Sequence, residues 1–208
     1  MGYRLNIDTV WDVISSWKCD NLVVVKELHA RIIYDNTTMA ISVCNISSRP
    51  DYLKAKTEAA RILNDFGLLE PPVNPADIAQ QLGVRVVFVG FTPEYDSISG
   101  FYDFDDETIY VNKYEFPLRQ TFTIAHELGH RLLHTEWAKS SDYKVLLRGD
   151  TNGNDPIEME ANTFAANLLV PRFMLDNYWK ELSLEQLSVL FAVSVPVIRN
   201  RISFEYGA

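Results

Sequence analysis

Residues 121–134 read TFTIAHELGHRLLH, and they hold three of the chain's four histidines. Their apolar spacing predicts a helix that runs to about His134. On such a helix His126 and His130 project from one face about a turn apart, close enough to bind one cation. With Glu127 beside them they form the H-E-x-x-H pattern of zinc hydrolases, in which a metal activates a water and a carboxylate accepts its proton. We therefore expect His126 and His130 as metal ligands and Glu127 as the general base.

A catalytic zinc needs a third protein ligand and one position left open for water. The metzincin pattern would place a glycine and a third histidine downstream, but Leu133 and Glu136 occupy those positions. His134 lies one turn beyond His130, yet three successive turns of one straight helix cannot readily surround a metal tetrahedrally. We expect His134 to support a ligand or to have a structural role, so the third ligand must come from elsewhere.

A second helix, predicted between Asp155 and Pro171, offers two glutamates. If Glu158 faces the metal, Asn162 shares its face one turn on and could orient a ligating histidine. Glu160 would lie on another face, which makes it the weaker candidate. Histidines at this spacing, and acids in a first helical turn, also occur on ordinary helices. Both helices are rich in apolar residues, however, and buried charges need a partner, which favours a cation.

The composition is that of a globular protein of 208 residues with 47% apolar residues. A formal charge of −9 argues against direct nucleic-acid binding as the main activity, although it suits a basic protein partner. No apolar run approaches the roughly 18 to 20 residues that a membrane span needs, so we expect a soluble, cytoplasmic protein. Cys19 and Cys44 form no CxxC or disulfide-rich pattern, which suits a reducing compartment.

The remaining segments predict an α+β protein in three parts: an N-terminal extension of unknown role (1–50), a core (51–171) and a C-terminal helical tail (172–208). Within the core we expect a helix over 53–66, a helix over 74–84 that begins at Asn74, a strand over 85–91, and a hairpin, SISGFYDF and ETIYVN, around Asp105 and Asp106. A polar stretch of about 20 residues before Asp155 predicts a loop. Residues 183–202 predict two short helices joined by a tight turn.

These motifs resemble the ImmA/IrrE family of bacterial and phage metallopeptidases from about Tyr52 to Pro171, most specifically in TFTIAHELGHRLLH and EMEANTFAANLLVP. The resemblance implies a zincin-like core, similar to gluzincins, with helices packed on a small mixed or antiparallel sheet. It implies His126, His130 and Glu158 as metal ligands and Glu127 as base. It also implies that a strand such as TIYVN lies along the cleft, where a substrate backbone could add as a further strand.

Family members typically cut a helix-turn-helix repressor in stress-response, phage or mobile-element regulation, so the resemblance implies a metal-dependent endopeptidase with such a partner. Zinc is the expected ion, although two histidines and a carboxylate also suit manganese or another divalent ion. Candidates for stabilising an oxyanion are Tyr102, Tyr110 and His134. One competing function is a binding module that grips its partner without cutting it, as the toxin or antitoxin of a pair. The other is a DNA-binding regulator, which rests only on Arg199 and Arg201 in the tail.

Overall fold

The computed structural model describes residues 49–91, 97–135, 146–147 and 155–207. The predictions for the first 48 residues, and for most of the polar segment before Asp155, lie outside the described residues. Every element and contact below belongs to the described part of the chain.

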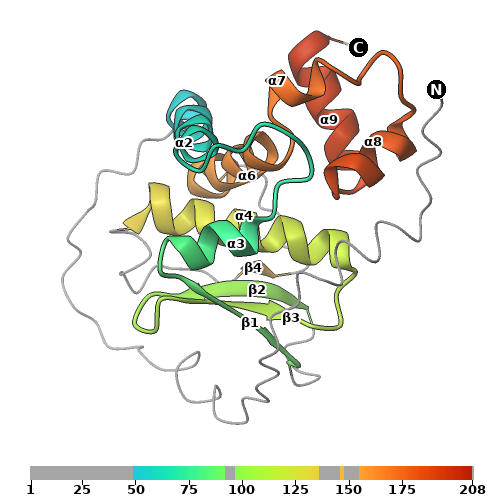
Figure 1. Cartoon of the computed structure of the whole chain (residues 1–208). Coiled ribbons are helices and arrows are strands. Elements are labelled where there is room, and N and C mark those ends of the chain that lie inside the picture. The colour runs from blue at the N-terminus through green and yellow to red at the C-terminus, as the bar shows by residue number, and fades with distance from the viewer. Residues whose placement is uncertain (1–48, 92–96, 136–145, 148–154, 208) are drawn as a thin grey trace.

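Four strands form one mixed sheet in the order β1-β3-β2-β4 (Figure 1). They are β1 (Arg85–Val89), β2 (Ile98–Asp103), β3 (Thr108–Asn112) and β4 (Leu146–Leu147). β2 and β3 form the expected antiparallel hairpin, and Glu107 in its turn adopts a positive φ of 48°. β1 pairs with β3 in parallel, and β4 pairs with β2 in antiparallel fashion. The predicted α+β class is confirmed, and the sheet is mixed.

Two predictions about this sheet are wrong. TIYVN, which is β3, cannot offer an edge to a substrate, because β1 and β2 pair with its two sides. The parallel pair between β1 and β3 joins two strands that β2 separates in the chain, and no local pattern predicts it. The polar segment that was expected to be only a loop contributes β4 beside β2. Among the described strands, β4 and β1 therefore form the two edges.

Seven helices are described, and they build layers on the sheet (Figure 1). α4 packs against β2 and β3 with α3 beside it, while α2 and α6 lie on the far side of α4. Their bounds are α2 (Tyr52–Asp65), α3 (Pro75–Gln81), α4 (Pro117–Leu133), α6 (Pro156–Leu169), α7 (Arg172–Leu175), α8 (Leu184–Phe191) and α9 (Val195–Tyr206). The expected caps are present, since the side chains of Asn74 and Asp155 accept from Ala76 N and Ile157 N.

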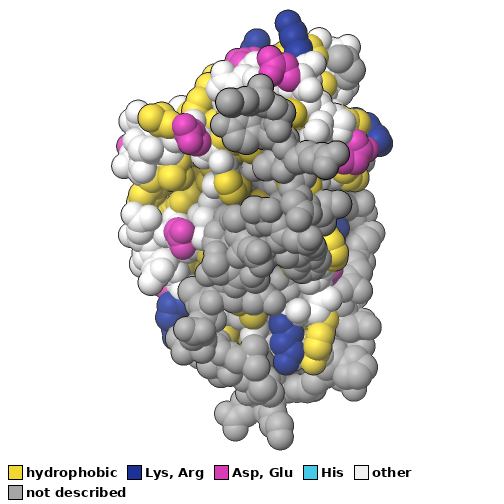
Figure 2. Space-filling model, turned by 45° about the vertical axis from the view of Figure 1, so that its right-hand side comes forward, with side chains coloured by type: hydrophobic (Ala, Val, Ile, Leu, Met, Phe, Trp, Pro, Cys, Tyr) yellow, Lys and Arg dark blue, Asp and Glu magenta, His cyan; other side chains and the backbone are white. Residues whose placement is uncertain are grey.

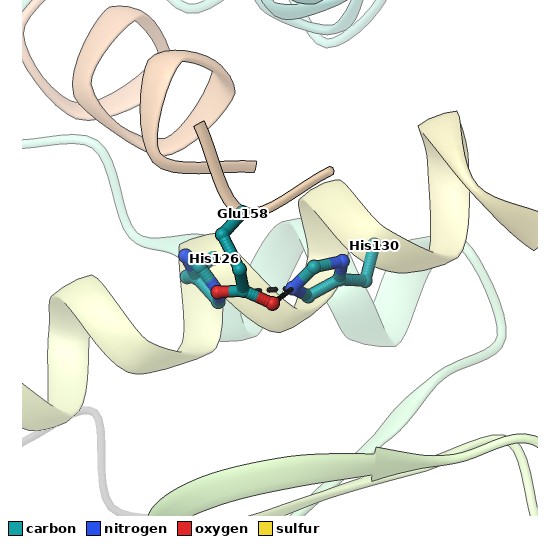
Figure 3. Close-up of side chains that lie close together, drawn as sticks. All are labelled: His126, His130 and Glu158. Atoms are coloured by element: carbon teal, nitrogen blue, oxygen red, sulfur yellow. Dashed lines mark hydrogen bonds and ion pairs between the residues drawn. The ribbon is translucent and has the colours of Figure 1, made fainter. Parts of the chain in front are cut away.

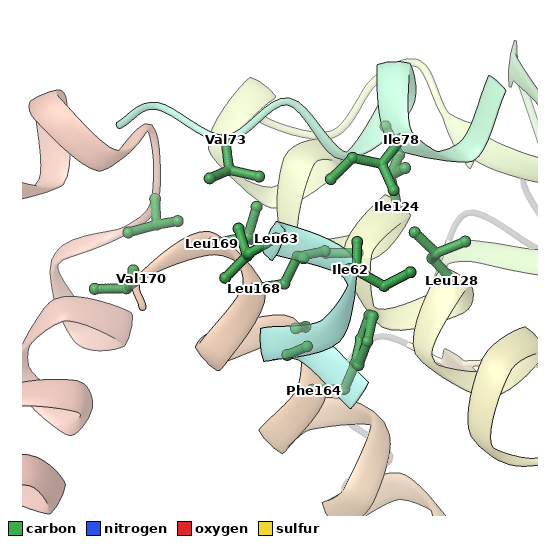
Figure 4. Packing of buried hydrophobic residues seen from close by; sticks show 14 of the residues in the cluster. Ile62, Leu63, Val73, Ile78, Ile124, Leu128, Phe164, Leu168, Leu169 and Val170 are labelled. Carbon is green, nitrogen blue, oxygen red and sulfur yellow. The ribbon is translucent and has the colours of Figure 1, made fainter. Parts of the chain in front are cut away.

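The apolar core lies where α2, α4 and α6 meet (Figure 4). Ile62, Leu128 and Phe164, one from each helix, have no exposed surface. The two tail helices, predicted correctly, join the same cluster through Phe191 and Ile198. Each buried aliphatic or aromatic side chain contributes roughly 1.5 to 3 kcal/mol to the free energy of folding. Burial on this scale keeps α4 and α6 packed against each other.

The tail does not present the surface that DNA reading would need. Arg201 is only 4% exposed, and its Nε donates to Val170 O (3.0 Å). Arg199 alone remains exposed of the two arginines on α9. On the face drawn in Figure 2, basic and acidic side chains of the described residues lie interspersed among apolar ones. Phosphate binding relies on several clustered cations, so these observations disfavour the DNA-binding alternative.

None of the described helices is by itself long and apolar enough to cross a membrane. α8 and α9 meet such a test only when they are taken together, and they are bent by 105° where they join.

Substituting Gly100 is expected to destabilise the fold through the contact between α4 and the sheet. A Cβ at this position of β2 would lie 2.6 Å from both Thr123 Cγ2 and Tyr110 O. Because Tyr110 O is backbone, the strand itself must shift, and Gly100→Ala should cost about 1 to 3 kcal/mol or more in the free energy of unfolding. Urea denaturation measures this cost. Gly83→Ala is the comparison, since nothing crowds that position and only its φ of +78° is unfavourable. Equal small losses in both variants would contradict the predicted clash.

Candidate metal centre

Three side chains from two helices converge on one point (Figure 3). His126 and His130 come from α4, and Glu158 comes from the first turn of α6. His126 Nε2 lies 2.9 Å from His130 Nε2, and the two oxygens of Glu158 lie 3.3 Å from these nitrogens, one to each. Both histidines are buried, whereas the Glu158 side chain keeps 24% of its surface exposed. The two histidines are therefore fixed in the protein interior, and the exposed part of Glu158 leaves the cluster accessible from the surface.

The donor set and spacing suit a divalent metal. One ligand atom from each of these residues lies within 4.8 Å of the others. Ligand atoms about 2.0 to 2.1 Å from a tetrahedral zinc stand roughly 3.3 Å apart, which is close to the separations between Glu158 and the histidines. Two imidazoles and one carboxylate leave a fourth position for water or substrate. The residues present thus fit the metal that the sequence pattern predicts.

Asn162 orients the first histidine. His126 Nδ1 lies 3.0 Å from Asn162 Oδ1, one turn beyond Glu158 on α6. An amide oxygen can only accept, so His126 donates through Nδ1 and leaves Nε2 for the metal. The close approach of the helices permits this contact, since a Cβ on Gly129 would lie 3.3 Å from Ala161 Cα.

The second histidine is oriented by a chain of three hydrogen bonds that reaches α2. His130 Nδ1 lies 3.3 Å from His134 Nδ1, His134 Nε2 lies 2.9 Å from Glu160 Oε2, and Asp51 N donates to Glu160 Oε1 (2.8 Å). Because the Glu160 carboxylate accepts from His134 Nε2, His134 Nδ1 is left to accept from His130 Nδ1. His130 then also presents Nε2 to the cluster. We call His130, His134, Glu160 and Asp51 N the histidine relay.

Glu127 lies against the sheet rather than among the cluster's ligand atoms. Its carboxylate is 1% exposed, and its Oε2 accepts from the backbone N of Tyr102 on β2 (3.1 Å). Glu127 follows His126 directly on α4, so its side chain projects toward the side of the helix that faces β2. The sequence named Tyr102 for its phenol, but the contact with Glu127 is made by the backbone, which no side-chain pattern could indicate.

The hydroxyls of the two candidate tyrosines bond to residues of the hairpin turn. Tyr110 stacks on Phe101, with ring centroids 5.1 Å apart, and donates to Asp106 Oδ2 (3.2 Å). It belongs to a small apolar cluster separate from the core that α4 joins. The phenol of Tyr102 donates to Glu107 Oε2 (2.6 Å), which also accepts from Arg131 Nε. Both hydroxyls therefore point toward the turn between β2 and β3, and these two hydrogen bonds involve no residue of the metal cluster.

Protonation within the cluster follows from burial and from Glu158. Burial lowers the pKa of His126, but the hydrogen bond to Glu158 and the charges of Glu127 and Glu158 outweigh it, so this pKa lies above its usual value. Burial lowers the pKa of His130 to about 4, and the charge of His126 acts in the same direction. Burial raises the pKa of Glu158, yet its hydrogen bonds to both histidines bring it well below its usual range. Without metal, these shifts favour the charged, doubly protonated form of His126 beside a neutral His130.

Metal affinity should consequently depend on pH. A metal must displace the second ring proton of His126, and the fraction of the protein that carries this proton grows as pH falls below the raised pKa. We expect the apparent affinity for zinc to rise about tenfold per pH unit until pH passes that pKa, and then to level off. Competition with a chromophoric chelator between pH 5.5 and 8.5 measures the slope. A flat profile across this range would mean that the metal-free cluster carries no displaceable proton.

A helix with H-E-x-x-H, opposed by a glutamate from a second helix above a mixed sheet, defines a protein of the metallopeptidase class. A family model of this class, peptidase M78, described as the IrrE N-terminal-like domain, matches residues 79–203. The chain belongs to this family, which confirms the resemblance noted in the sequence.

Two relatives extend the comparison. The chain is 28% identical over 151 residues to the "Uncharacterized immunity region protein 2" of Bacillus phage phi105, covering 71% of this chain and 89% of the phage protein. Its fold is similar to that of a solved "Mycobacterium tuberculosis transcriptional regulator", with a TM-score of 0.55 and 20% identity. That match covers 72% of this chain but 47% of the regulator, so the chain spans about half of its length. At this identity the likeness concerns the fold alone.

Proposed function

We propose that the chain is a zinc-dependent endopeptidase that cuts a protein partner, a repressor of the helix-turn-helix class, in a phage or mobile-element regulatory system. The observation that carries this proposal is the position of Glu127. A buried carboxylate one residue from His126, held in place by the N–H of Tyr102, is suited to accept a proton beside the metal cluster. A protein that only binds its partner has no need of this group, which disfavours the non-cleaving alternative.

Each residue then has a distinct role. His126, His130 and Glu158 would hold the metal, which when bound supplies a Lewis acid that activates water and polarises a carbonyl. Glu127 accepts the proton from the attacking water and returns it to the leaving amine. Asn162 keeps His126 in the tautomer that offers Nε2, and the histidine relay does the same for His130.

The regulatory setting rests on the phage relative. That protein carries the description of an immunity region protein, and the chain covers most of its length. Immunity regions maintain or release repression, so a peptidase acting there would remove a repressor. The chain's formal charge of −9 would attract a partner with a basic DNA-binding surface. The three-part division of the chain, with residues 1–50 as an extension, remains a prediction.

The proposal is tested by co-expressing the full chain with the product of a neighbouring gene that encodes a helix-turn-helix protein. We expect two fragments of the partner, with one cut mapped by mass spectrometry. Purified protein should contain about one zinc per chain, a chelator should stop cleavage, and added zinc should restore it. Stable binding of the partner without any cut, by protein that has been shown to contain zinc, would contradict the endopeptidase proposal and favour the binding module.

A further inference from the structure

A pocket of about 480 Å³ lies between α2, α6 and α9, beside the metal centre. Its walls are largely apolar and include Phe122 of α4 together with Val197 and Phe204 of α9. This volume falls in the range of small-molecule sites and exceeds what one amino-acid side chain fills. The lining also includes polar side chains, among them Asn200 and Arg201. The pocket therefore combines apolar walls with a few hydrogen-bonding groups.

The charges around the pocket favour an anion. Lys56 and Arg201 both line it, and no acidic residue does so among the described residues. The nearby Glu205 is shared by three cations: its carboxylate lies 2.7 Å from Arg201 Nη1, 3.5 Å from Arg172 Nη1 and 4.0 Å from Lys56 Nζ. Asp176 also faces one of these cations, with its Oδ2 3.9 Å from Arg172 Nε. Two carboxylates do not balance three positive charges, so this side of the pocket keeps a net positive charge within an acidic protein.

Arg201 also has an unused donor. Its Nε donates to Val170 O, and its Nη1 donates to Glu205. Its Nη2 is buried and has no hydrogen-bond partner among the described residues. A buried charged donor without an acceptor is costly, so an oxygen that reaches it is stabilised there.

We propose that this pocket binds a carboxylate attached to an apolar body. The carboxylate accepts from Arg201 Nη2 near Lys56, and the apolar body packs between Phe122, Val197 and Phe204. Lys56 Nζ already lies 4.1 Å from the ring centre of Phe204, so charge and apolar surface meet at this end of the pocket. Asn162 links this pocket to the metal centre, because it lines the pocket and also binds His126.

This chemistry has two sources: a free small acid, or an acidic residue next to an apolar one in a protein. Isothermal titration of the zinc-loaded full chain distinguishes them with two probes. 3-Phenylpropionate represents the free acid, and N-acetyl-phenylalanyl-glutamic acid amide represents the peptide. The uncharged 3-phenylpropanamide tests the charge, and it should bind about tenfold more weakly than the acid. The tighter of the two charged probes identifies the source.

Two variants locate the binding. Asn200→Asp places a negative charge at the pocket and should weaken binding of the charged probes about tenfold. Asn64→Asp is its matched control, because Asn64 is equally exposed on α2 but does not line the pocket. Val197→Trp should fill the pocket and abolish binding, whereas Val195→Trp, on the same helix outside the lining, should not. Thermal melts confirm that each variant is folded.

Several outcomes overturn the proposal. Equal affinity for the acid and the amide would show that no cation receives the carboxylate. Unchanged affinity in Asn200→Asp and Val197→Trp would place the probe elsewhere, including on the metal itself. If neither charged probe binds at millimolar concentration, the pocket does not bind the proposed class of ligand. None of these readouts depends on cleavage, so they are independent of the endopeptidase proposal.

Discussion

Replacing Glu127 with glutamine should abolish cleavage while the protein keeps its metal. The amide cannot accept a proton, and loss of a general base lowers the rate by about 10²- to 10⁴-fold. The amide oxygen can still accept from Tyr102 N, so the local geometry should be preserved. We expect kcat/KM for the partner protein to fall by this factor, with zinc content and melting temperature close to those of the wild type.

The control for this variant is Glu181→Gln, the same chemical change at an exposed position remote from α4 in the chain. It should leave kcat/KM unchanged. If Glu127→Gln cuts the partner as fast as the wild type, Glu127 is not the base. If the wild type and Glu127→Gln bind the partner alike and neither cuts it, the chain is a binding module.

Exchanging the two glutamates of α6 one at a time should separate their roles. Glu158→Gln removes the charged ligand and should weaken zinc binding by more than about 100-fold, taking cleavage with it. Glu160→Gln leaves all three ligands in place and loosens only the histidine relay, where such changes typically cost about 10- to 100-fold in metal affinity. Competition with a chelator of known affinity measures both losses on folded protein.

The order of these two effects decides between the glutamates. A larger loss of zinc in Glu160→Gln than in Glu158→Gln would assign Glu160 as the ligand. The two variants also control for each other, because each removes one carboxylate from the first two turns of the same helix. His134→Ala should match Glu160→Gln, since both interrupt the same chain of hydrogen bonds.

Helical periodicity and capping residues predicted α4 and α6, and they also predicted which side chains share one face of each helix. The spacing of His126 and His130, and of Glu158 and Asn162, follows from helical periodicity, and the caps at Asn74 and Asp155 mark where helices begin. Apolar residues on both α4 and α6 predicted that the two helices would pack together. These signals favoured Glu158 over Glu160, and the family resemblance implied the same choice; in the structure the Glu158 oxygens lie 3.3 Å from both histidines.

Contacts between distant segments were not predictable in this way. The pairing of β1 with β3 encloses TIYVN within the sheet, and it depends on a parallel crossover with no signature in either strand. The hydrogen bonds from Tyr102 N to Glu127 and from Asp51 N to Glu160 are made by backbone groups, which every residue except proline carries. Side-chain patterns therefore identify the ligands, but they do not identify the backbone that holds them.

The N–H of Asp51 has a practical consequence for where the chain can be shortened. Asp51 caps α2 by accepting from Lys54 N, and its own N–H binds Glu160, so a single residue fixes both the helix start and the end of the relay. A fragment designed to begin at Tyr52 would contain the three proposed metal ligands and the proposed base. It would nevertheless lose the last hydrogen bond behind His130. Fragments should begin several residues earlier, so that Asp51 retains an ordinary peptide N–H.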